Sequence, residues 1–259
     1  MDKVNNTIDT SWKIDSEAVK NYGILTKNNK FVLSWGLNYY VNRLKKIRFM
    51  GKNSILLDAG CGVGHWSVAS ALLNKSIKAV DIQEKYLKIG KLIAKKYRLQ
   101  NIEFKKARTE RLPYPDEYFD FILCYSVWMY TDKEKSLKEF CRVLKPGGRI
   151  YLGGLDGFGW LLNLFLRGLK KFDRREIGMA LAAIKNGNYI TEASARNLLL
   201  RNDFIPIEFC ADGLAGNKKI KVEPSYKIAK KWGFWNVFGA LAIKYKKIKS
   251  IDNGKPDEN

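Results

Sequence analysis

Short apolar runs alternate with amphipathic stretches between residues 30 and 153 of the chain. The runs are mostly continuous and are bounded by glycine, proline or polar residues, as is typical of buried strands. They cover residues 54–58, 77–82, 101–107, 119–125 and 149–153. Before and between these runs, apolar residues recur every three or four positions, which predicts helices. The predicted helices cover residues 30–48, 65–73, 84–97 and 134–144.

This alternation indicates an α/β fold, in which a parallel sheet has helices on both faces. Sheets of this kind bind ligands at the carboxyl ends of their strands. The residues that follow each strand are therefore the candidates for function. The first such turn reads Asp-Ala-Gly-Cys-Gly-Val-Gly over residues 58–64, and His65 opens the next helix.

Glycines in this turn allow a ligand to approach the backbone, and the helix start offers free N–H groups. By itself the turn could equally be a tight strand–helix connection. The dinucleotide fingerprint G-x-G-x-x-G does not fit, because His65 stands where its last glycine is required. An NAD-linked oxidoreductase is therefore disfavoured.

The pattern D-x-G-x-G-x-G resembles the first motif of class I S-adenosylmethionine (SAM)-dependent methyltransferases. Three later stretches agree with the family in order and position: Asp81 at the end of the second strand, residues 110–120, and residues 144–149. The resemblance covers residues 50–154 well. It implies a Rossmann-like, seven-stranded, mostly parallel sheet with helices on both faces and a helical insertion after strand five. A final helix from Thr191 and two last strands, within residues 204–210 and 232–245, complete it.

The resemblance also implies a domain plan and a site. We expect an N-terminal arm at residues 1–30, the methyltransferase domain at 31–249 with an insertion or lid at 155–190, and a polar tail at 250–259. An acid such as Asp81 accepts hydrogen bonds from both ribose hydroxyls of the cofactor. The expected cofactor-binding residues are Asp58, Gly60, Cys61, Gly62, Gly64, Asp81, Ile82, Thr109, Glu110 and Tyr125.

Two points within this site stay open. The family often has an acid where this chain has Arg108, so the adenine contact is left to Thr109 or Glu110. For Asp58, the alternative to cofactor binding is a purely structural role. SAM is an activated donor, so no catalytic residue is assigned. No metal site is expected, because the cysteines are far apart and His65 is the only histidine. Tyr125 and Tyr130 are the candidates on the acceptor side, since aromatic rings favour a cationic methyl donor. For His65, packing is favoured over general-base catalysis.

A cationic amphipathic helix is predicted over residues 158–174, and a second helix follows to residue 190. Its apolar face carries Phe158, Leu161, Leu162, Phe165 and Leu169, and its opposite face carries Arg167, Lys170, Lys171 and Arg174. The helix is too short to span a bilayer. Three interpretations remain: packing against the sheet, a substrate lid hinged on the preceding glycines, or a helix resting on anionic lipid.

The net charge is +21, from 47 basic and 26 acidic residues, and residues 218–249 hold ten lysines against one acid. Lysine-rich coding explains part of this excess; an anionic substrate, a membrane surface or nucleic acid would explain the rest. The N-terminus has no apolar signal core. The four cysteines are far apart in the sequence, so disulfides are not expected. Free cysteines are typical of a reducing compartment. We therefore expect a cytoplasmic protein, with peripheral membrane attachment as an open alternative and an undetermined oligomeric state.

The sequence thus predicts an enzyme that moves a methyl group from SAM to a small-molecule, glycan or lipid-intermediate acceptor, leaving S-adenosylhomocysteine (SAH). An RNA methyltransferase is the first alternative, because the chain is basic. A SAM-binding module without activity is the second alternative.

Overall fold

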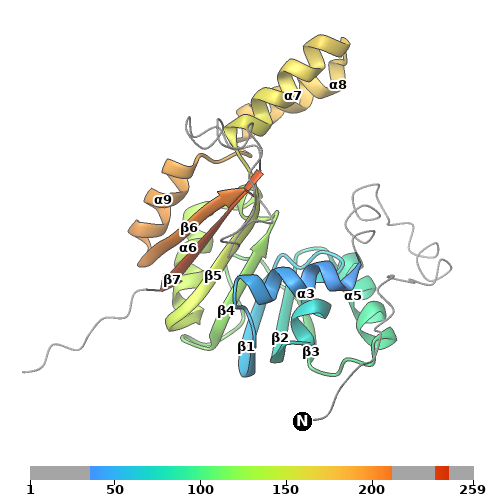
Figure 1. Ribbon diagram of the computed structural model, residues 1–259, viewed down its shortest axis with the longest axis vertical. Helices are drawn as coiled ribbons and strands as arrows, with labels where there is room; N and C mark the ends of the chain where they lie inside the picture. The colour runs from blue at the N-terminus through green and yellow to red at the C-terminus, as the bar shows by residue number, and fades with distance from the viewer. Residues whose placement is uncertain (1–35, 212–236, 245–259) are drawn as a thin grey trace, which may run out of the picture.

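The computed structural model describes residues 36–211 and 237–244, except for some side chains within these ranges. The predicted arm and tail, most of the lysine-rich segment, and the start of the helix predicted at residues 30–48 lie outside the described residues. Seven strands form one sheet in the order β3-β2-β1-β4-β5-β7-β6 (Figure 1). The predicted fold class is therefore confirmed.

Strands β1 to β5 are parallel, and β7 runs antiparallel to both of its neighbours, β5 and β6. Their bounds are β1 Gly51–Ala59, β2 Asn74–Asp81, β3 Ile102–Lys106, β4 Phe119–Tyr125, β5 Leu144–Asp156, β6 Phe204–Ala211 and β7 Val237–Lys244. Strand β5 is longer than the predicted 149–153, because it includes the Pro-Gly-Gly turn. Its register against β4 shifts across that turn.

The helices lie at the predicted places with small changes at their ends. Their bounds are α3 Leu37–Lys46, α4 His65–Ala71, α5 Glu84–Lys96, the 3-10 turn η1 Trp128–Tyr130, α6 Lys133–Val143, α7 Phe158–Lys171, α8 Arg174–Asn186 and α9 Glu192–Arg201. Thr191 caps α9 as predicted, since its hydroxyl accepts a hydrogen bond from the Ser194 N–H at 3.1 Å. Among the described residues, no helix has the length and apolarity needed to cross a membrane.

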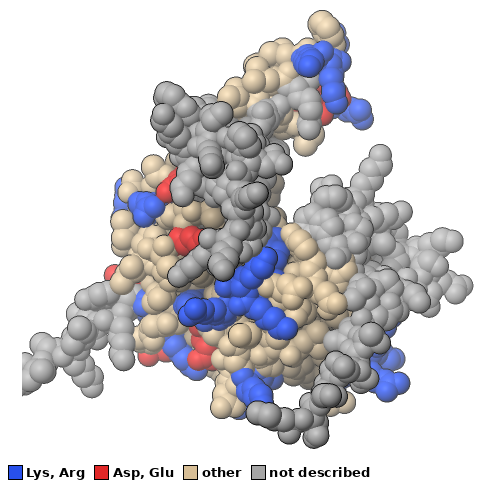
Figure 2. All heavy atoms as spheres, viewed as in Figure 1, with Lys and Arg blue, Asp and Glu red and all other residues tan. Residues whose placement is uncertain are grey.

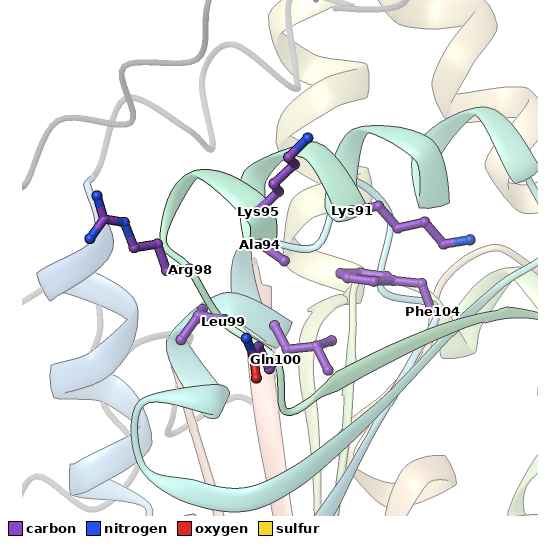
Figure 3. A pocket seen from close by; sticks show the side chains of 8 residues that line it. Lys91, Ala94, Lys95, Arg98, Leu99, Gln100 and Phe104 are labelled. Carbon is purple, nitrogen blue, oxygen red and sulfur yellow. The ribbon is translucent and has the colours of Figure 1, made fainter.

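The strongly positive composition is visible on the surface, where Lys and Arg side chains form a band over the centre of the molecule and gather at the far end of α7 and α8 (Figure 2). A pocket of about 480 Å³ lies between α5 and β3, at the outer edge of the sheet (Figure 3). Its described lining includes Lys91, Lys95, Arg98 and Phe104, and none of the predicted site residues. This pocket is therefore separate from the carboxyl ends of β1 and β4.

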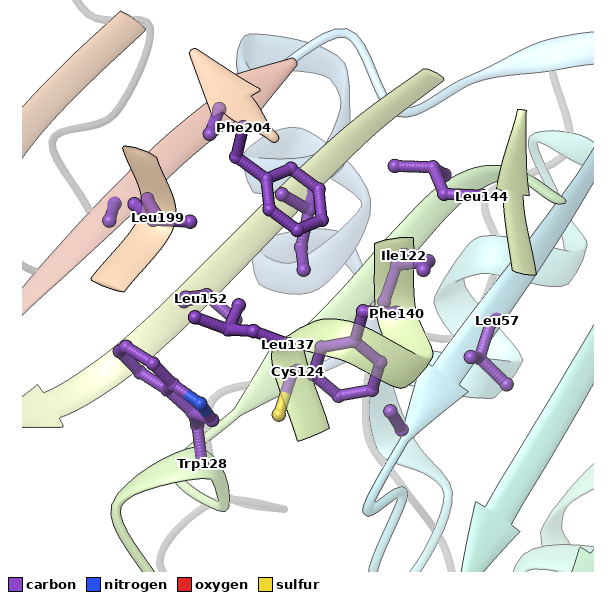
Figure 4. Packing of buried hydrophobic residues seen from close by; sticks show 14 of the residues in the cluster. Leu57, Ile122, Cys124, Trp128, Leu137, Phe140, Leu144, Leu152, Leu199 and Phe204 are labelled. Carbon is purple, nitrogen blue, oxygen red and sulfur yellow. The ribbon is translucent and has the colours of Figure 1, made fainter. Parts of the chain in front are cut away.

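Helices cover both faces of the sheet, and each face has its own core. On one face, Leu137 and Phe140 of α6 and Leu199 of α9 are fully buried against β4 and β5 (Figure 4). On the other face, α3, α4 and α5 contribute residues such as Tyr40 and Trp66. The two cores fix the strands in place, so the loops at their carboxyl ends start from rigid positions.

The insertion after β5 differs from the prediction in two ways. Helix α7 ends at Lys171, because Phe172 adopts a left-handed backbone with φ of 52°. The helix packs mainly against α8 rather than on the sheet, and the pair projects from the strand ends (Figure 1). Packing against the sheet was therefore the wrong interpretation of its apolar face.

Candidate functional site

The glycine turn lies at the carboxyl end of β1, where the strand order changes direction between β1 and β4. The N–H groups of Gly60 and Cys61 both donate to Val80 O, at 2.8 and 2.9 Å, which ties the turn to β2. Gly60 has φ of +79°, and a Cβ there would lie 2.4 Å from the Val127 side chain. Gly62 has φ of +51°, and a Cβ there would meet no atom within 4 Å. The turn therefore packs against Val127 at Gly60, and it has open space beside it at Gly62.

Asp81 and the glycine turn are in direct contact. One carboxylate oxygen accepts from the Gly62 N–H at 2.9 Å, and the other accepts from the Gln83 N–H at 2.8 Å. Burial raises the pKa of Asp81, and these backbone hydrogen bonds partly offset the rise. Each oxygen has a second lone pair that can accept a hydroxyl donor. Next to it, the apolar side chain of Ile82 is 56% exposed, which suits a flat apolar ligand.

Asp58 lies beneath the turn and is almost completely buried. Its carboxylate accepts a hydrogen bond from the Ser67 hydroxyl at 2.5 Å. Burial raises the pKa of Asp58 to about 7, and the Ser67 hydrogen bond offsets only part of that rise. A cationic ligand group nearby would favour the ionised form of this acid.

The raised pKa of Asp58 predicts a specific pH dependence of stability. Because the folded pKa lies above the unfolded value, the folded state loses stability as the pH rises from the unfolded pKa of about 4 to the folded pKa of about 7, and the penalty is complete above that range. Asp58→Asn should therefore stabilise the ligand-free protein by about 2 kcal/mol more near pH 8 than near pH 5. Urea unfolding of both proteins at both pH values measures this difference. An equal effect of the substitution at the two pH values would contradict it.

Thr109 and Glu110 are held by a hydroxyl network beside η1 and α6. The Thr109 and Ser136 hydroxyls share a hydrogen bond of 3.0 Å in the interior, and Ser136 donates to the Thr131 hydroxyl at 3.0 Å. Glu110 accepts from the Asp132 N–H at 3.2 Å and from the Thr109 hydroxyl at 3.3 Å. These contacts fix the loop after β3. An adenine contact through Thr109 or Glu110 remains a prediction.

Tyr125, at the end of β4, belongs to an aromatic group around Arg43 of α3. The Arg43 guanidinium lies 5.2 Å from the ring centres of both Tyr125 and Trp66. It donates to the hydroxyls of Tyr125 and Tyr151, each at 3.3 Å. Arg43 thus fixes the Tyr125 ring at the strand end. Arg43 was not predicted from the sequence, although its spacing of three residues from Tyr40 places it on the buried side of the helix.

Cys61 and His65 are poor candidates for catalysis. Burial raises the pKa of the Cys61 thiol well above its usual value, so the reactive thiolate is disfavoured. Burial lowers the pKa of His65 to about 3. Its ring packs edge-on against Tyr40, with 4.8 Å between the ring centres. The packing interpretation of His65 is therefore the one that its environment supports.

Tyr130 at the end of η1 and Asp156 at the end of β5 form a hydrogen-bonded pair. The Tyr130 hydroxyl donates to Asp156 at 3.4 Å, and the Tyr130 side chain is 59% exposed. Burial raises the pKa of Asp156 to about 6, and the hydrogen bond from Tyr130 acts in the opposite direction. Tyr130 was predicted from the sequence, and Asp156 was not. The signal for Asp156 was its place three residues after the end of the fifth apolar run.

Comparison with known proteins finds a family match in the middle of the chain. Residues 57–152 match the family described as methyltransferase domain. The chain is 33% identical over 98 residues to the uncharacterized methyltransferase YcgJ of Bacillus subtilis, covering 38% of this chain and 39% of the relative. It is 34% identical over 124 residues to the ubiquinone/menaquinone biosynthesis C-methyltransferase UbiE of Francisella tularensis subsp. novicida, covering 44% and 50%. The chain thus spans half or less of the length of these relatives.

Solved structures share the fold at low sequence identity. The crystal structure of YcgJ has a TM-score of 0.57 at 17% identity and covers 81% of this chain and 99% of its own. The geranyl diphosphate C-methyltransferase of Streptomyces coelicolor A3(2) has a TM-score of 0.57 at 15% identity, with 78% of each chain covered. That structure holds Mg²⁺, geranyl diphosphate and SAH. Residues 57–152 thus match a methyltransferase domain, and the sheet order agrees with the class I S-adenosylmethionine-dependent fold that the sequence predicted.

Proposed function

We propose that this protein transfers a methyl group from SAM to a small-molecule, glycan or lipid-intermediate acceptor. The observation that carries the proposal is the contact between Asp81 and the glycine turn at the strand switch point. It joins a hydroxyl-accepting carboxylate to a backbone turn that is open at Gly62. The exposed apolar side chain of Ile82 stands beside them.

The residues present fit the proposed cofactor. Asp81 would accept the ribose hydroxyls, and Ile82 would pack against the adenine ring. Asp58 would bind the cationic amino group of the methionine end. Burial raises the pKa of its carboxyl, and a nearby positive charge would stabilise the ionised form. When bound, SAM supplies an electrophilic methyl group on a sulfonium. The chain therefore needs only to align the acceptor and to remove one proton from it.

For the proton, we propose Asp156 as the acceptor-side base. Its pKa near 6 leaves it ionised at neutral pH, yet close enough to neutrality to take a proton. Tyr130 orients the carboxylate and offers an exposed aromatic surface to the acceptor. Tyr125 lies on the neighbouring strand end, where an aromatic ring favours a cationic donor.

The names of two similar proteins support a lipid-like acceptor. One is a quinone C-methyltransferase and the other acts with geranyl diphosphate, according to their names. Labelled methyl transfer from SAM into a fractionated extract of the source organism tests the acceptor class. We expect label in the organic-soluble or small-molecule fraction. Label in RNA would overturn this class and favour the RNA alternative, which the charge of +21 motivates.

A further inference from the structure

The helical hairpin formed by α7 and α8 stands apart from the rest of the molecule. It joins β5 at Gly157 and extends beyond the strand ends (Figure 1). Its small core contains Leu161 and Leu164 of α7 with Ala180 and Ala183 of α8. This core holds the two helices to each other. The surfaces of α7 and α8 that lie outside this small core are therefore mostly exposed.

Much of that outward surface is apolar. Leu162, Leu166 and Leu169 of α7 are all exposed, and their spacing of four and three residues places them on one stripe. This stripe lies well away from the side that Leu161 and Leu164 bury. The sequence pattern predicted Leu162 and Leu169 on the same packing face as Leu161. In the structure the apolar arc is wider than α8 can cover.

Helix α8 continues the apolar surface. Leu181 and Ile184 are exposed and lie three residues apart, so they are neighbours on the helix. Relative to the buried side of each helix, the α7 and α8 stripes are displaced in the same rotational sense. A local twofold axis relates two antiparallel helices and preserves that sense. The two stripes therefore lie on the same face of the hairpin.

The tip of the hairpin combines an exposed aromatic ring with cations. Phe172 joins the two helices and is 91% exposed. Lys170, Lys171, Arg174 and Arg175 surround it in the sequence and are exposed. Figure 2 shows blue side chains gathered at this end of the hairpin, next to its tan surface. Residues 158–186 hold six basic and two acidic residues, a net charge of +4.

We propose that this hairpin docks on an anionic lipid surface, with Phe172 and the leucine stripe inserted into the interface and the surrounding cations on the lipid phosphates. An apolar surface of this kind with cations at its border is typical of helices that lie in the membrane interface. The charge complementarity favours acidic lipid over a neutral protein partner. Because the hairpin leaves the sheet directly after Asp156, docking would place the proposed acceptor side towards the membrane.

Co-sedimentation of the full chain with vesicles tests the docking proposal. The probes are phosphatidylcholine vesicles with and without phosphatidylglycerol. We expect the chain to sediment with the acidic vesicles and only weakly with the neutral ones. The triple variant Leu166→Ser, Leu169→Ser, Phe172→Ser should lower the partition coefficient about tenfold or more. These side chains are exposed, so the hairpin core stays intact.

Two controls separate the hairpin from general surface effects. The triple variant Leu200→Ser, Ile205→Ser, Ile207→Ser removes equally exposed apolar side chains from α9 and β6, and it should bind vesicles like the parent. The double variant Lys170→Glu, Lys171→Glu reverses two charges at the tip and should weaken vesicle binding. The control is Lys88→Glu, Lys95→Glu, which makes the same change of charge on α5 and should weaken binding less. Equal losses in the tip and control variants would overturn the proposal. The proposal would also be overturned if the chain does not bind acidic vesicles, or if the leucine stripe instead forms a dimer. It would be overturned as well if the cations at the tip bind RNA and not vesicles.

The outcome is independent of methyl transfer, since vesicle binding needs neither cofactor nor acceptor. A chain that binds acidic vesicles through the hairpin but transfers no methyl group would keep the docking proposal and reject the proposed function. A chain that methylates an acceptor without binding vesicles would do the reverse.

Discussion

Asp81→Ala should weaken SAH binding about 5- to 150-fold, which corresponds to about 1–3 kcal/mol. The reason is that the variant removes the carboxylate that we propose as the acceptor for both ribose hydroxyls. The hydroxyls would then be buried without partners in the complex. Isothermal titration calorimetry with the parent and the variant measures the difference directly.

The same carboxylate also accepts the Gly62 and Gln83 N–H groups, so the turn itself could change in the alanine variant. Asp81→Asn is the second variant, because its amide keeps one acceptor oxygen for the turn. Glu103→Ala is the matched control: it removes a half-exposed acid on the neighbouring strand that pairs with Lys78. SAH affinity equal to that of the parent in both Asp81 variants would show that the assignment of the ribose contact is wrong.

Asp156→Asn should lower kcat for methyl transfer by about 10²- to 10⁴-fold, the range found for removal of a general base. The ionised form is the base, so the rate of the parent should rise with pH through about 6, the raised pKa of Asp156. This acidic limb should disappear in the variant. Labelled methyl incorporation into the acceptor fraction, measured across the pH range, gives both the rate and the profile.

Tyr130→Phe is the matched variant for this prediction. Its hydrogen bond lowers the pKa of Asp156, so its loss should move the acidic limb to higher pH while much of the rate remains. SAH affinity should stay unchanged in both variants, because neither side chain is part of the proposed cofactor contacts. A parent-like pH profile in Asp156→Asn would exclude Asp156 as the base. A uniform loss of rate at every pH in Tyr130→Phe would indicate a purely structural role of Tyr130.

The sheet was predictable because its signals are local. Strand β4 was predicted at its observed bounds, Phe119–Tyr125, since a buried strand of a parallel sheet reads as one apolar run. The glycine turn was equally legible, because Gly60 and Gly62 both need a left-handed backbone. The sequence placed this turn and Asp81 at the ends of two successive strands, but it did not predict the hydrogen bond between them.

Other features depend on contacts between distant segments, which a single sequence does not show. Arg43 reaches Tyr125 and Tyr151 across 82 and 108 positions of the chain. Asp156 gains its raised pKa from burial beside η1, a loop 26 residues away. The apolar periodicity of α7 predicted a packed face, yet it could not tell which part of that face α8 would cover. The exposed stripe around Leu166 follows from that tertiary arrangement.

Calorimetric titration of the unmodified chain with SAH and, in parallel, with NAD tests the cofactor site most directly. We expect saturable binding of SAH at one site per chain and no detectable binding of NAD, because the glycine turn departs from the dinucleotide fingerprint at His65. Binding of NAD without binding of SAH would contradict the assignment of the cofactor site at Asp81 and the glycine turn.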